Sequence, residues 1–360
     1  MINTIEDLQN LVRQGRVQEA KQCGWVSITD TGFGFLFNYT PKAAYENNWT
    51  PFERMSRGLI LGYDGSIVAR PFDKFFNWGE RGRTTNSPIS YVMEKMDGSM
   101  GSVFRNPITG EYQVATRGSV ESEQARWATE KLKDYTIEGS IASGVTLIVE
   151  IIYPENRIIV DYGSRSGLVL LAARYNETGH YFSQTTLECI ASACKMRMAP
   201  IHAVDTPEQL LSLLPKLTVN EEGFVAVFSS GERFKFKGDA YKLAHKNLSG
   251  VSYSRTIQYV MDDEVDTLLD IVPDEWLDMV KQWLADIHEE VERVSERVEN
   301  YLDTNFEKSA KELVEILQED KVSKTVFSCV MKGFRGHPYK DMILKEMKRD
   351  ASKKSLIFGG

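Results

Sequence analysis

The spacing of apolar residues changes along the chain. Near the N-terminus, Ile5, Leu8, Leu11 and Val12 recur at helical spacing, which predicts a surface helix over residues 4–22. From about residue 25 to 240, apolar residues gather in short runs between turn residues, as in strands. The clearest predicted strands cover residues 59–61, 145–152, 168–173 and 224–228, with helices at 121–133 and 184–196. The pattern predicts an α+β domain built on antiparallel sheets.

A helical period returns after residues 247–250. Apolar residues then alternate steps of three and four through Leu277, Val280, Leu284, Ile287, Val291, Val294 and Val298. Such a seam occurs in coiled-coil dimers, but a long helix packed in an all-α domain gives the same pattern, and we favour that second interpretation. We therefore expect a first domain over residues 1–246 and an all-helical C-terminal domain over 253–360.

Composition restricts the function only broadly. The 360 residues are 42% hydrophobic and 26% charged, as in an ordinary globular protein, and the length allows two domains. No run of eighteen apolar residues is present, and the polar N-terminus is unlike a signal peptide, so we expect no membrane association. The four cysteines form no CxxC pair, which argues against a zinc site or a disulfide framework and predicts a cytoplasmic protein.

Charge is unevenly distributed around the net value of −8. Residues 251–320 contain 6 basic and 20 acidic residues, whereas residues 321–360 contain 10 basic and 3 acidic ones. The acidic segment is poorly suited to nucleic acid, but the tail could bind it or could equally be a solvated helix. Eight of these ten basic residues follow residue 331, with Phe334 and Tyr339 between them: Lys332, Arg335, Lys340, Lys345, Lys348, Arg349, Lys353 and Lys354.

The stretch EKMDGSMGS, residues 94–102, places Lys95 before a glycine-rich turn. It could be a solvated hairpin, a phosphate-binding turn with a cationic helper, or the site of a nucleophilic lysine. An amine attacks phosphorus only when neutral, which requires nearby cations or desolvation. In a strand over residues 233–237, Arg233, Lys235 and Lys237 would share one face and could supply those cations. The alternative is an edge strand protected by its lysines.

Two carboxylates stand at unusual positions. Glu150 interrupts the apolar run of residues 147–152, and Glu222 directly precedes the predicted strand FVAVF. A buried carboxylate needs a metal, a cation or a hydroxyl group as a partner, although Glu150 could also lie on the outward face of an edge strand. Together with the lysines, these residues suit metal-assisted phosphoryl transfer.

In this order, the motifs resemble the covalent nucleotidyltransferases, which include ATP-dependent DNA and RNA ligases and mRNA capping enzymes. KMDG at 95–98 looks like their KxDG nucleophile motif, and it is followed by the segments around Glu150, Glu222 and Lys235–Lys237. Further segments are similar to the phage RNA ligase 1 family: residues 56–58, 70–77, 118–119, 122–125 and 154–158. The resemblance covers about residues 35–245 and implies an antiparallel-sheet nucleotidyltransferase (ATP-grasp-like ligase) domain.

The resemblance implies an RNA ligase that uses ATP and Mg²⁺ or Mn²⁺. Lys95 would attack the α-phosphorus of ATP to form lysyl–AMP. AMP would then pass to an RNA 5′-phosphate, and a 3′-hydroxyl would displace it. Gly98 and Ser99 would let the backbone approach the nucleotide closely. We expect a monomer acting on RNA, plausibly in the repair of nicked tRNA, and working in the host cytoplasm if the source is viral.

The same resemblance implies roles for the other motif residues. Glu150 would hold the ribose or a metal, and Glu222 would help to hold the divalent cation. Lys235 and Lys237 would contact the α-phosphate, and Lys237 would also orient the departing pyrophosphate. Arg57 and Lys74 would contact the ATP phosphates, and Phe76 would shape the nucleotide site. Arg117 stands where the family pattern has lysine; its permanent charge still suits phosphate, so we include it in the nucleotide site.

Other functions stay open on the sequence alone. A DNA ligase or capping-type guanylyltransferase would share the chemistry, but these usually carry an OB-fold after the lysine-bearing strand, and the residues after Lys237 have a helical pattern. A catalytically idle nucleic-acid-binding module of the same fold is a third possibility. The predicted helical C-terminal domain would then act on the choice of RNA.

Overall fold

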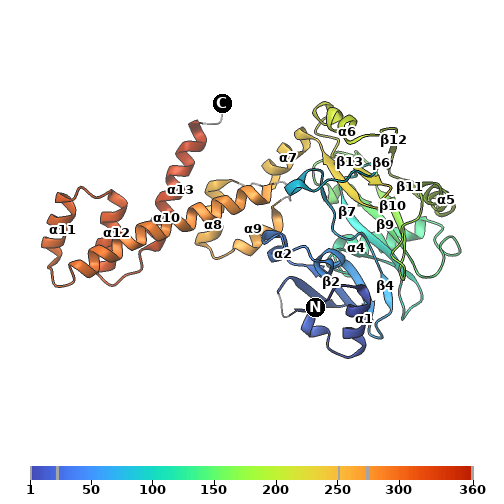
Figure 1. Ribbon diagram of the computed structural model, residues 1–360, viewed down its shortest axis with the longest axis horizontal. Helices are drawn as coiled ribbons and strands as arrows, with labels where there is room; N and C mark the ends of the chain where they lie inside the picture. Colours follow the sequence, from blue (N-terminus) through green and yellow to red (C-terminus); the bar gives the residue numbers. More distant parts are fainter. Residues whose placement is uncertain (1, 22–23, 250–251, 273–275, 358–360) are drawn as a thin grey trace. The chain divides into compact units, whose positions relative to one another are not determined.

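The computed structural model describes residues 2–21, 24–249, 252–272 and 276–357. The chain divides into two compact units, Met1–His245 and Lys246–Gly360. The first unit combines helices with sheets that are mostly antiparallel, and the described part of the second is largely helical (Figure 1). The predicted fold class is therefore confirmed. The division falls inside helix α7 (Asp239–Ser249), and residues 250–251 of the predicted boundary region lie outside the described residues.

The first sheet of the N-terminal unit is antiparallel throughout, in the order β1-β2-β3-β4. Its core is formed by side chains such as Phe37 and Leu59, on which Leu8 and Val12 of helix α1 (Ile5–Arg13) pack. Two short helices that begin at prolines, α2 (Pro41–Tyr45) and α3 (Pro51–Met55), connect β2 to β3. The four strands are β1 (Val26–Asp30), β2 (Gly34–Tyr39), β3 (Arg57–Gly62) and β4 (Ile67–Ala69).

Two five-stranded sheets form the rest of the unit. One has the order β11-β10-β9-β7-β8: β7 (Ser99–Arg105), β8 (Tyr112–Thr116), β9 (Val145–Ile152), β10 (Gly167–Tyr175) and β11 (Arg197–Met198). The other has the order β12-β6-β13-β14-β5: β5 (Phe76–Asn77), β6 (Ile89–Glu94), β12 (Ile201–His202), β13 (Gly223–Phe228) and β14 (Arg233–Lys237). Their strands pair antiparallel, except for the parallel pairs β10–β11 and β14–β5.

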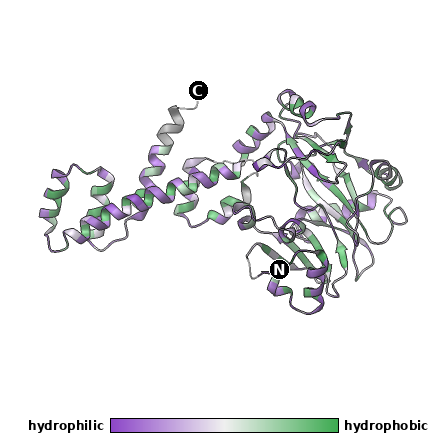
Figure 2. Ribbon diagram, viewed as in Figure 1, coloured by the Kyte–Doolittle hydropathy of each residue, from purple (hydrophilic) through white to green (hydrophobic). Residues whose placement is uncertain are grey.

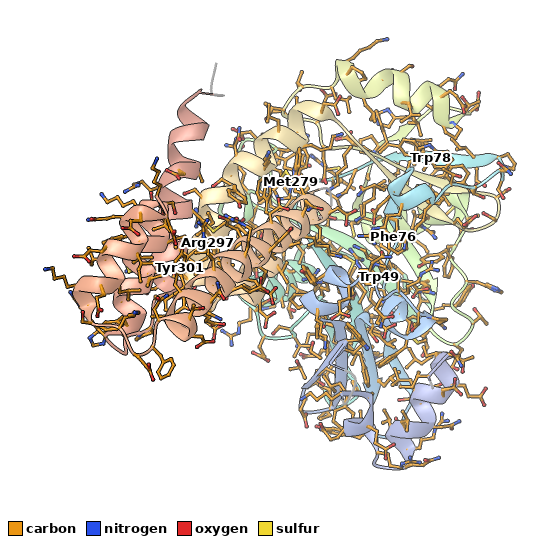
Figure 3. All side chains as sticks on the ribbon, turned by 60° about the vertical axis from the view of Figure 1, so that its left-hand side comes forward. Trp49, Phe76, Trp78, Met279, Arg297 and Tyr301 are labelled. Carbon is orange, nitrogen blue, oxygen red and sulfur yellow. The ribbon has the colours of Figure 1, made fainter. Side chains whose placement is uncertain are left out.

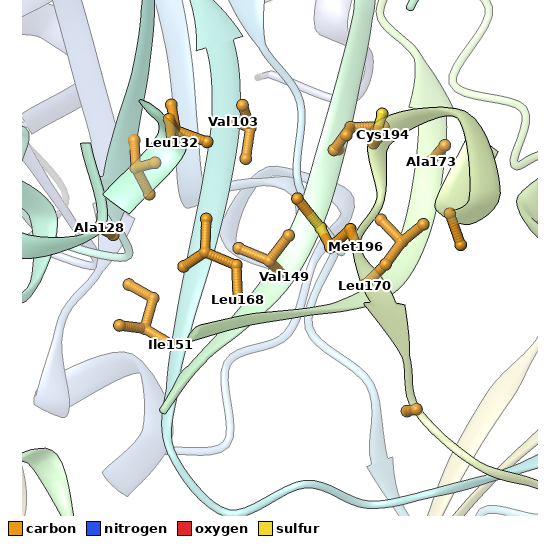
Figure 4. Packing of buried hydrophobic residues seen from close by; sticks show 14 of the residues in the cluster. Val103, Ala128, Leu132, Val149, Ile151, Leu168, Leu170, Ala173, Cys194 and Met196 are labelled. Atoms are coloured by element: carbon orange, nitrogen blue, oxygen red, sulfur yellow. The ribbon is translucent and has the colours of Figure 1, made fainter. Parts of the chain in front are cut away.

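Strand β9 is the central strand of its sheet and is buried along its whole length. On one face, Leu147, Val149 and Ile151 join the largest apolar core, to which helices α4 (Glu123–Lys131) and α5 (Gln184–Cys194) contribute (Figure 4). The hydropathy colouring shows the same division, with green strands inside and mixed colours along the surface helices (Figure 2). The predicted strands at 145–152 and 168–173 and both predicted helices are thus confirmed.

The predicted N-terminal helix over residues 4–22 is wrong in length. Helix α1 covers only Ile5–Arg13, because Gly15 adopts a positive φ of 67° that no continuing helix allows. A separate 3₁₀ turn follows at Val17–Lys21, and residue 22 lies outside the described residues. The other helix of the N-terminal unit is α6 (Pro207–Leu213), whose proline stands in the first turn as helix geometry prefers.

The second unit is built around helix α10 (Leu277–Thr304), which carries the predicted apolar seam. Val280, Leu284, Ile287, Val294 and Val298 are buried within the chain itself. A seam that is already covered is not available to a second copy, so the structure favours the all-α interpretation over the coiled-coil dimer. The other helices are α8 (Tyr253–Met261), α9 (Val265–Ile271), α11 (Ala310–Glu319), α12 (Lys324–Phe334) and α13 (Lys340–Ile357).

Several cations of the basic tail already have partners. Lys332 and Lys345 both bind the Asp341 carboxylate, at 2.9 Å and 3.2 Å, and Arg349 pairs with Glu346. The side chains of Lys353 and Lys354 lie outside the described residues. These pairs favour the interpretation of the tail as a solvated helix. In the described part of the chain, no helix combines the length and the apolar character needed to cross a membrane.

Candidate active site

Lys95 lies where the chain passes from one five-stranded sheet to the other. It follows strand β6, and four residues later the chain enters β7 in the other sheet. Its backbone N–H donates a 2.8 Å hydrogen bond to the carbonyl oxygen of Gly223, which begins β13. The lysine is therefore fixed at the junction of the two sheets by backbone contacts.

The glycine after this lysine is explained by a close approach of two strands. A Cβ atom at Gly98 would lie 2.6 Å from the carbonyl oxygen of Ile151 and 3.1 Å from Cγ of Glu150. Only glycine lets the turn approach β9 this closely. The close approach that the structure contains is to β9, whereas the sequence had suggested an approach to the nucleotide. Ser99 likewise contacts protein, because its hydroxyl lies 3.1 Å from Oδ1 of Asn156.

Asp97, the acidic residue of the KMDG stretch, holds distant segments together. Its carboxylate accepts hydrogen bonds from the backbone N–H groups of Ile159 and Val160, both at 2.8 Å, and from the Tyr241 hydroxyl at 2.7 Å. Its own N–H donates to the Tyr162 hydroxyl at 2.8 Å. This set of bonds fixes the turn that carries Lys95, and no sequence pattern had pointed to Tyr162 or Tyr241.

Glu222 is the carboxylate closest in contact with the lysines. Its Oε1 atom lies 2.8 Å from Nζ of Lys95 and 3.4 Å from Nζ of Lys237, and the side chain is only 3% exposed. The backbone explains its position: Gly223 pairs with Lys237 across β13 and β14, and the same glycine binds Lys95. One buried carboxylate thus holds two lysines from different strands.

Glu150 is a buried acid to which the described residues donate no hydrogen bond. It is 8% exposed and sits on the central strand β9, so the alternative of an outward face on an edge strand is wrong. The described residues give its carboxylate no hydrogen bond and no ion pair. Burial raises its pKa to about 8, and the nearby charge of Lys95 offsets only part of that rise. An acid in this state would be stabilised by a cation or a hydroxyl group.

Most of the predicted residues line one cavity of about 200 Å³, which lies between the two five-stranded sheets. Arg57, Lys95, Glu150, Lys235 and Lys237 are among its lining residues. The face shared by Arg233, Lys235 and Lys237 is present as expected, and β14 is not an edge strand, because β5 pairs with it. The apolar part of the wall includes Phe72, Phe75, Met93, Met100, Leu171, Val225 and Val227.

Lys74 and Phe76 line a second cavity, of about 370 Å³, rather than the first. Lys74 is 3% exposed, and its ammonium group lies 5.0 Å from the centre of the Trp49 ring and 5.8 Å from that of Phe76. Figure 3 marks these two rings, which meet edge to face at 5.8 Å. The two cavities share Phe75 and Arg233 in their walls.

Arg117 lines neither of these two cavities. Its guanidinium donates a 3.2 Å hydrogen bond to the Tyr39 hydroxyl and lies 5.2 Å from the centre of that ring. Its backbone passes so close to Gly58 that a Cβ there would lie 3.2 Å from the Cα of Arg117. Arg117 is therefore packed beside the segment of Arg57, but its side chain is not part of the cavity wall to which Arg57 contributes.

The oxygen donors at the centre of the site suit a hard divalent cation such as Mg²⁺ or Mn²⁺. The Glu150 carboxyl, to which the described residues give no hydrogen bond, is the observation that fits such an ion, and Glu222 contacts the neighbouring Lys95. Within the described ranges, no group of three or more acidic, histidine or cysteine side chains is gathered as a complete metal site. The protein would thus supply only part of the coordination shell.

Several known proteins are similar to part of this chain. A putative RNA ligase of Thermovibrio ammonificans is 30% identical over 212 residues, which cover 54% of this chain and 54% of that protein. A putative bifunctional polynucleotide kinase/RNA ligase of Autographa californica nuclear polyhedrosis virus is 27% identical over 275 residues, covering 66% of this chain and 38% of that protein. The chain therefore spans about half the length of the first relative and less of the second.

Among solved structures, a mutant of the Naegleria gruberi RNA ligase with ATP and Mn is 19% identical, with a TM-score of 0.37. It covers 45% of this chain and 52% of its own. A sequence model of a family described as RNA ligase matches residues 55–247, a segment that contains Lys95, Glu150, Glu222 and Lys237. Because this segment exceeds half of the 360 residues, the chain belongs to the RNA ligase family of the phage RNA ligase 1 type.

Proposed function

We propose that this chain is an ATP-dependent RNA ligase that joins 5′-phosphate and 3′-hydroxyl RNA ends through lysyl–AMP and RNA-adenylate. The observation that carries the proposal is the position of the Lys95 amine. It lies in a cavity lined by Arg57, Lys235 and Lys237, and it is 2.8 Å from Glu222. A primary amine next to cations that could hold phosphate oxygens is suited to attack on phosphorus.

In the first step, Nζ of Lys95 forms a bond to the α-phosphorus of ATP. The bond from that phosphorus to the oxygen bridging to the β-phosphate breaks, and pyrophosphate leaves with the electron pair. The ammonium group must first lose a proton, and Glu222 lies at hydrogen-bond distance to accept it. Lys235 and Lys237 would neutralise the charge that develops on the α-phosphate oxygens.

In the second step, an oxygen of the RNA 5′-phosphate attacks the same phosphorus and the N–P bond of Lys95 breaks. The lysine regains a proton, and the RNA carries AMP in a 5′–5′ pyrophosphate linkage. In the third step, the 3′-hydroxyl oxygen of the other end attacks the RNA phosphate. A phosphodiester bond forms, AMP leaves, and the hydroxyl proton passes to solvent.

Glu150 and Glu222 would hold a divalent metal ion, Mg²⁺ or Mn²⁺. When bound, the ion would neutralise charge on the ATP phosphates. Because Glu150 is otherwise buried without a partner, binding a cation would also relieve the cost of ionising it. Arg57 and Lys74 would bind the outer ATP phosphates, with Phe76 packing beside Lys74, and Arg117 would position the segment of Arg57.

We further propose that the unit of residues 1–246 performs nucleotide chemistry, and that the helical unit of residues 253–360 selects RNA such as nicked tRNA. A DNA ligase or capping enzyme is less favoured because the described residues after Lys237 form helices and no OB-fold strands. A catalytically idle module is disfavoured by the full set of lysines and carboxylates around Lys95.

The proposed function is tested with RNA substrates that differ in the chemical group at the 5′ end. The protein would be incubated with ATP, Mg²⁺ or Mn²⁺, and single-stranded RNA carrying a 5′-phosphate and a 3′-hydroxyl; joined or circular RNA is expected. RNA with a 5′-hydroxyl serves as the matched control and should stay unjoined. Sealing of nicked DNA but not RNA would favour a DNA ligase, transfer of GMP from GTP would favour a capping enzyme, and no nucleotide transfer would favour the idle module.

A further inference from the structure

The second cavity, which holds Lys74, is strongly basic. Four cationic side chains line it, Arg54, Lys74, Arg83 and Arg233, against two acidic ones, Asp73 and Glu232. Asp73 is already neutralised by Arg174, which binds it through two hydrogen bonds of 2.9 Å and 3.0 Å. Glu232 is exposed to solvent. The cavity therefore has a net positive charge that nothing in its own wall balances.

Arg233 is the least expected member of this wall. It is only 9% exposed, yet the described residues give it no carboxylate partner. Its guanidinium lies 3.6 Å from the centre of the Tyr181 ring and 5.3 Å from that of Phe72, and it donates a 3.3 Å hydrogen bond to the carbonyl of Gly231. A buried cation held only by rings and one carbonyl is a ready site for an anion.

Arg83 adds a second unsatisfied guanidinium. Its Nη1 atom is buried without a hydrogen bond, and Glu80 lies 3.8 Å from it. The guanidinium lies 4.0 Å from the centre of the Phe76 ring, and Nη2 donates to Oδ1 of Asn47 at 3.2 Å. Both arginines are thus oriented by aromatic rings, with donor capacity left over for phosphate oxygens.

We propose that this cavity binds the 5′-phosphate of the RNA donor strand when that phosphate attacks lysyl–AMP, and that Arg83 and Arg233 are the residues that hold it. The inference rests on the proposed function and adds to it the place of the donor end. A terminal phosphate monoester carries about two negative charges, as on a phosphorylated side chain, and matches paired guanidinium groups.

The direction of attack supports this place. The incoming oxygen must approach the α-phosphorus roughly in line with the breaking bond to Lys95, hence from the side away from the lysine. Along strand β13, Gly223 binds Lys95 and Val227 pairs with Arg233. Four residues of strand span about 13 Å. In the cavity of about 200 Å³ that both residues line, which we call the nucleotide cavity, Arg233 therefore marks the end that is distant from Lys95.

A third cavity is the alternative place from which the RNA 5′-phosphate could reach lysyl–AMP. It measures about 660 Å³ and contains Arg165, Lys195 and Arg197. It shares Glu94 and Met96 with the nucleotide cavity, and these residues flank Lys95. A phosphate entering there would arrive on the side of the lysine, where the N–P bond blocks in-line attack. Arg165 therefore provides a matched control, because its loss removes the same charge from the wrong side.

The experiment follows lysyl–AMP after it has formed. Wild-type protein and the variants Arg233→Gln, Arg83→Gln and Arg165→Gln are labelled with radioactive ATP, freed of nucleotide and mixed with 5′-phosphorylated RNA. Transfer of AMP to RNA should slow at least about tenfold in Arg233→Gln and in Arg83→Gln, since one lost charge contact to a transition state often costs 10²–10³. Arg165→Gln should stay within about threefold of wild type.

The same adducts are also mixed with pyrophosphate, which reverses the first step. If departing pyrophosphate and the arriving RNA phosphate use one cavity in turn, both reactions should slow together in the two cavity variants. Slowing of the pyrophosphate reaction alone would overturn the proposal, as would loss of RNA transfer in Arg165→Gln alone. Arg83 is 28% exposed, so its variant tests the cavity even if Arg233→Gln fails to fold. Failure of the proposed function looks different, because wild-type protein would then form no adduct.

Discussion

Nζ of Lys95 lies 2.8 Å from Oε1 of Glu222, and the same carboxylate oxygen lies 3.4 Å from Nζ of Lys237. This contact places an acceptor next to the amine that must lose a proton before it can attack phosphorus. It also holds the side chains of two lysines close together. Lys95 directly follows β6 and Glu222 directly precedes β13, and the antiparallel pairing of these two strands brings the side chains together.

Removing either side of this contact should impair the first chemical step. Glu222→Ala and Lys237→Ala should each reduce self-adenylylation by about 10²–10³ while the fold persists, because each removes a charge contact needed near the α-phosphate. Single-turnover labelling with ATP measures the rate, and circular dichroism checks the fold. Glu221→Ala is the matched control, since Glu221 is adjacent but exposed. A loss of less than about threefold in Glu222→Ala or Lys237→Ala would remove that residue from the mechanism.

The raised pKa of Glu150 predicts a dependence on pH. Metal binding requires the ionised carboxylate, and burial raises the pKa to about 8, so apparent Mg²⁺ or Mn²⁺ affinity should increase as the pH rises towards 8. Titrating self-adenylylation with metal at pH 6 to 9 measures this increase. Glu150→Gln should bind metal weakly at every pH and lose the trend. An affinity that is flat with pH in the wild type would contradict this account of Glu150.

The same acid should affect stability, with a definite sign. Between the ordinary value of 4.5 and the folded value of about 8, the folded state holds a proton that the unfolded state has released. Stability therefore falls as the pH rises through this window. Without metal, Glu150→Gln should gain in melting temperature relative to wild type from pH 5 to pH 8. A constant difference between the two proteins would show that Glu150 is ionised in the folded protein.

Gly98→Ala tests the approach of the Lys95 turn to strand β9. The new Cβ would meet the Ile151 carbonyl oxygen at 2.6 Å, and a backbone atom cannot move aside easily. We expect a loss of about 1–3 kcal/mol in unfolding free energy, the usual cost of overpacking. Urea denaturation gives the value. Gly118→Ala is the control, because a Cβ there would have 4.0 Å to its nearest neighbour. Equal stabilities for the two variants would contradict the packing argument.

The sequence correctly predicted those strands and helices in which burial of one or both faces produces a clear spacing of apolar residues. Strand β9 is apolar except at Thr146 and Glu150, because both of its faces are covered. The N-terminal helix was predicted to residue 22 although its apolar spacing ends at Val12, close to the observed end at Arg13, and the chain turns at Gly15. Propensity and spacing thus identified element types better than their ends.

The sequence motifs identified the candidate residues that belong to them. They did not identify residues that reach the site only through tertiary packing. The order of motifs singled out Lys95, Glu150, Glu222, Lys235 and Lys237, and the structure gathers these around one cavity and its wall. It did not separate Lys74 and Phe76 into a second cavity. Nor did it indicate Tyr241, which binds Asp97 across 144 residues of sequence. Such contacts depend on how the sheets pack, which no local pattern contains.

The central claim is that Lys95 carries AMP. Protein incubated with ATP and Mg²⁺ would be denatured, its intact mass measured, and the modified peptide sequenced. We expect wild type and the control Lys133→Ala, which alters an exposed lysine paired with Glu130, to gain one AMP at Lys95 that pyrophosphate removes. Lys95→Ala should gain none. AMP on the Lys95→Ala protein, or on a different residue of the wild type, would contradict the account.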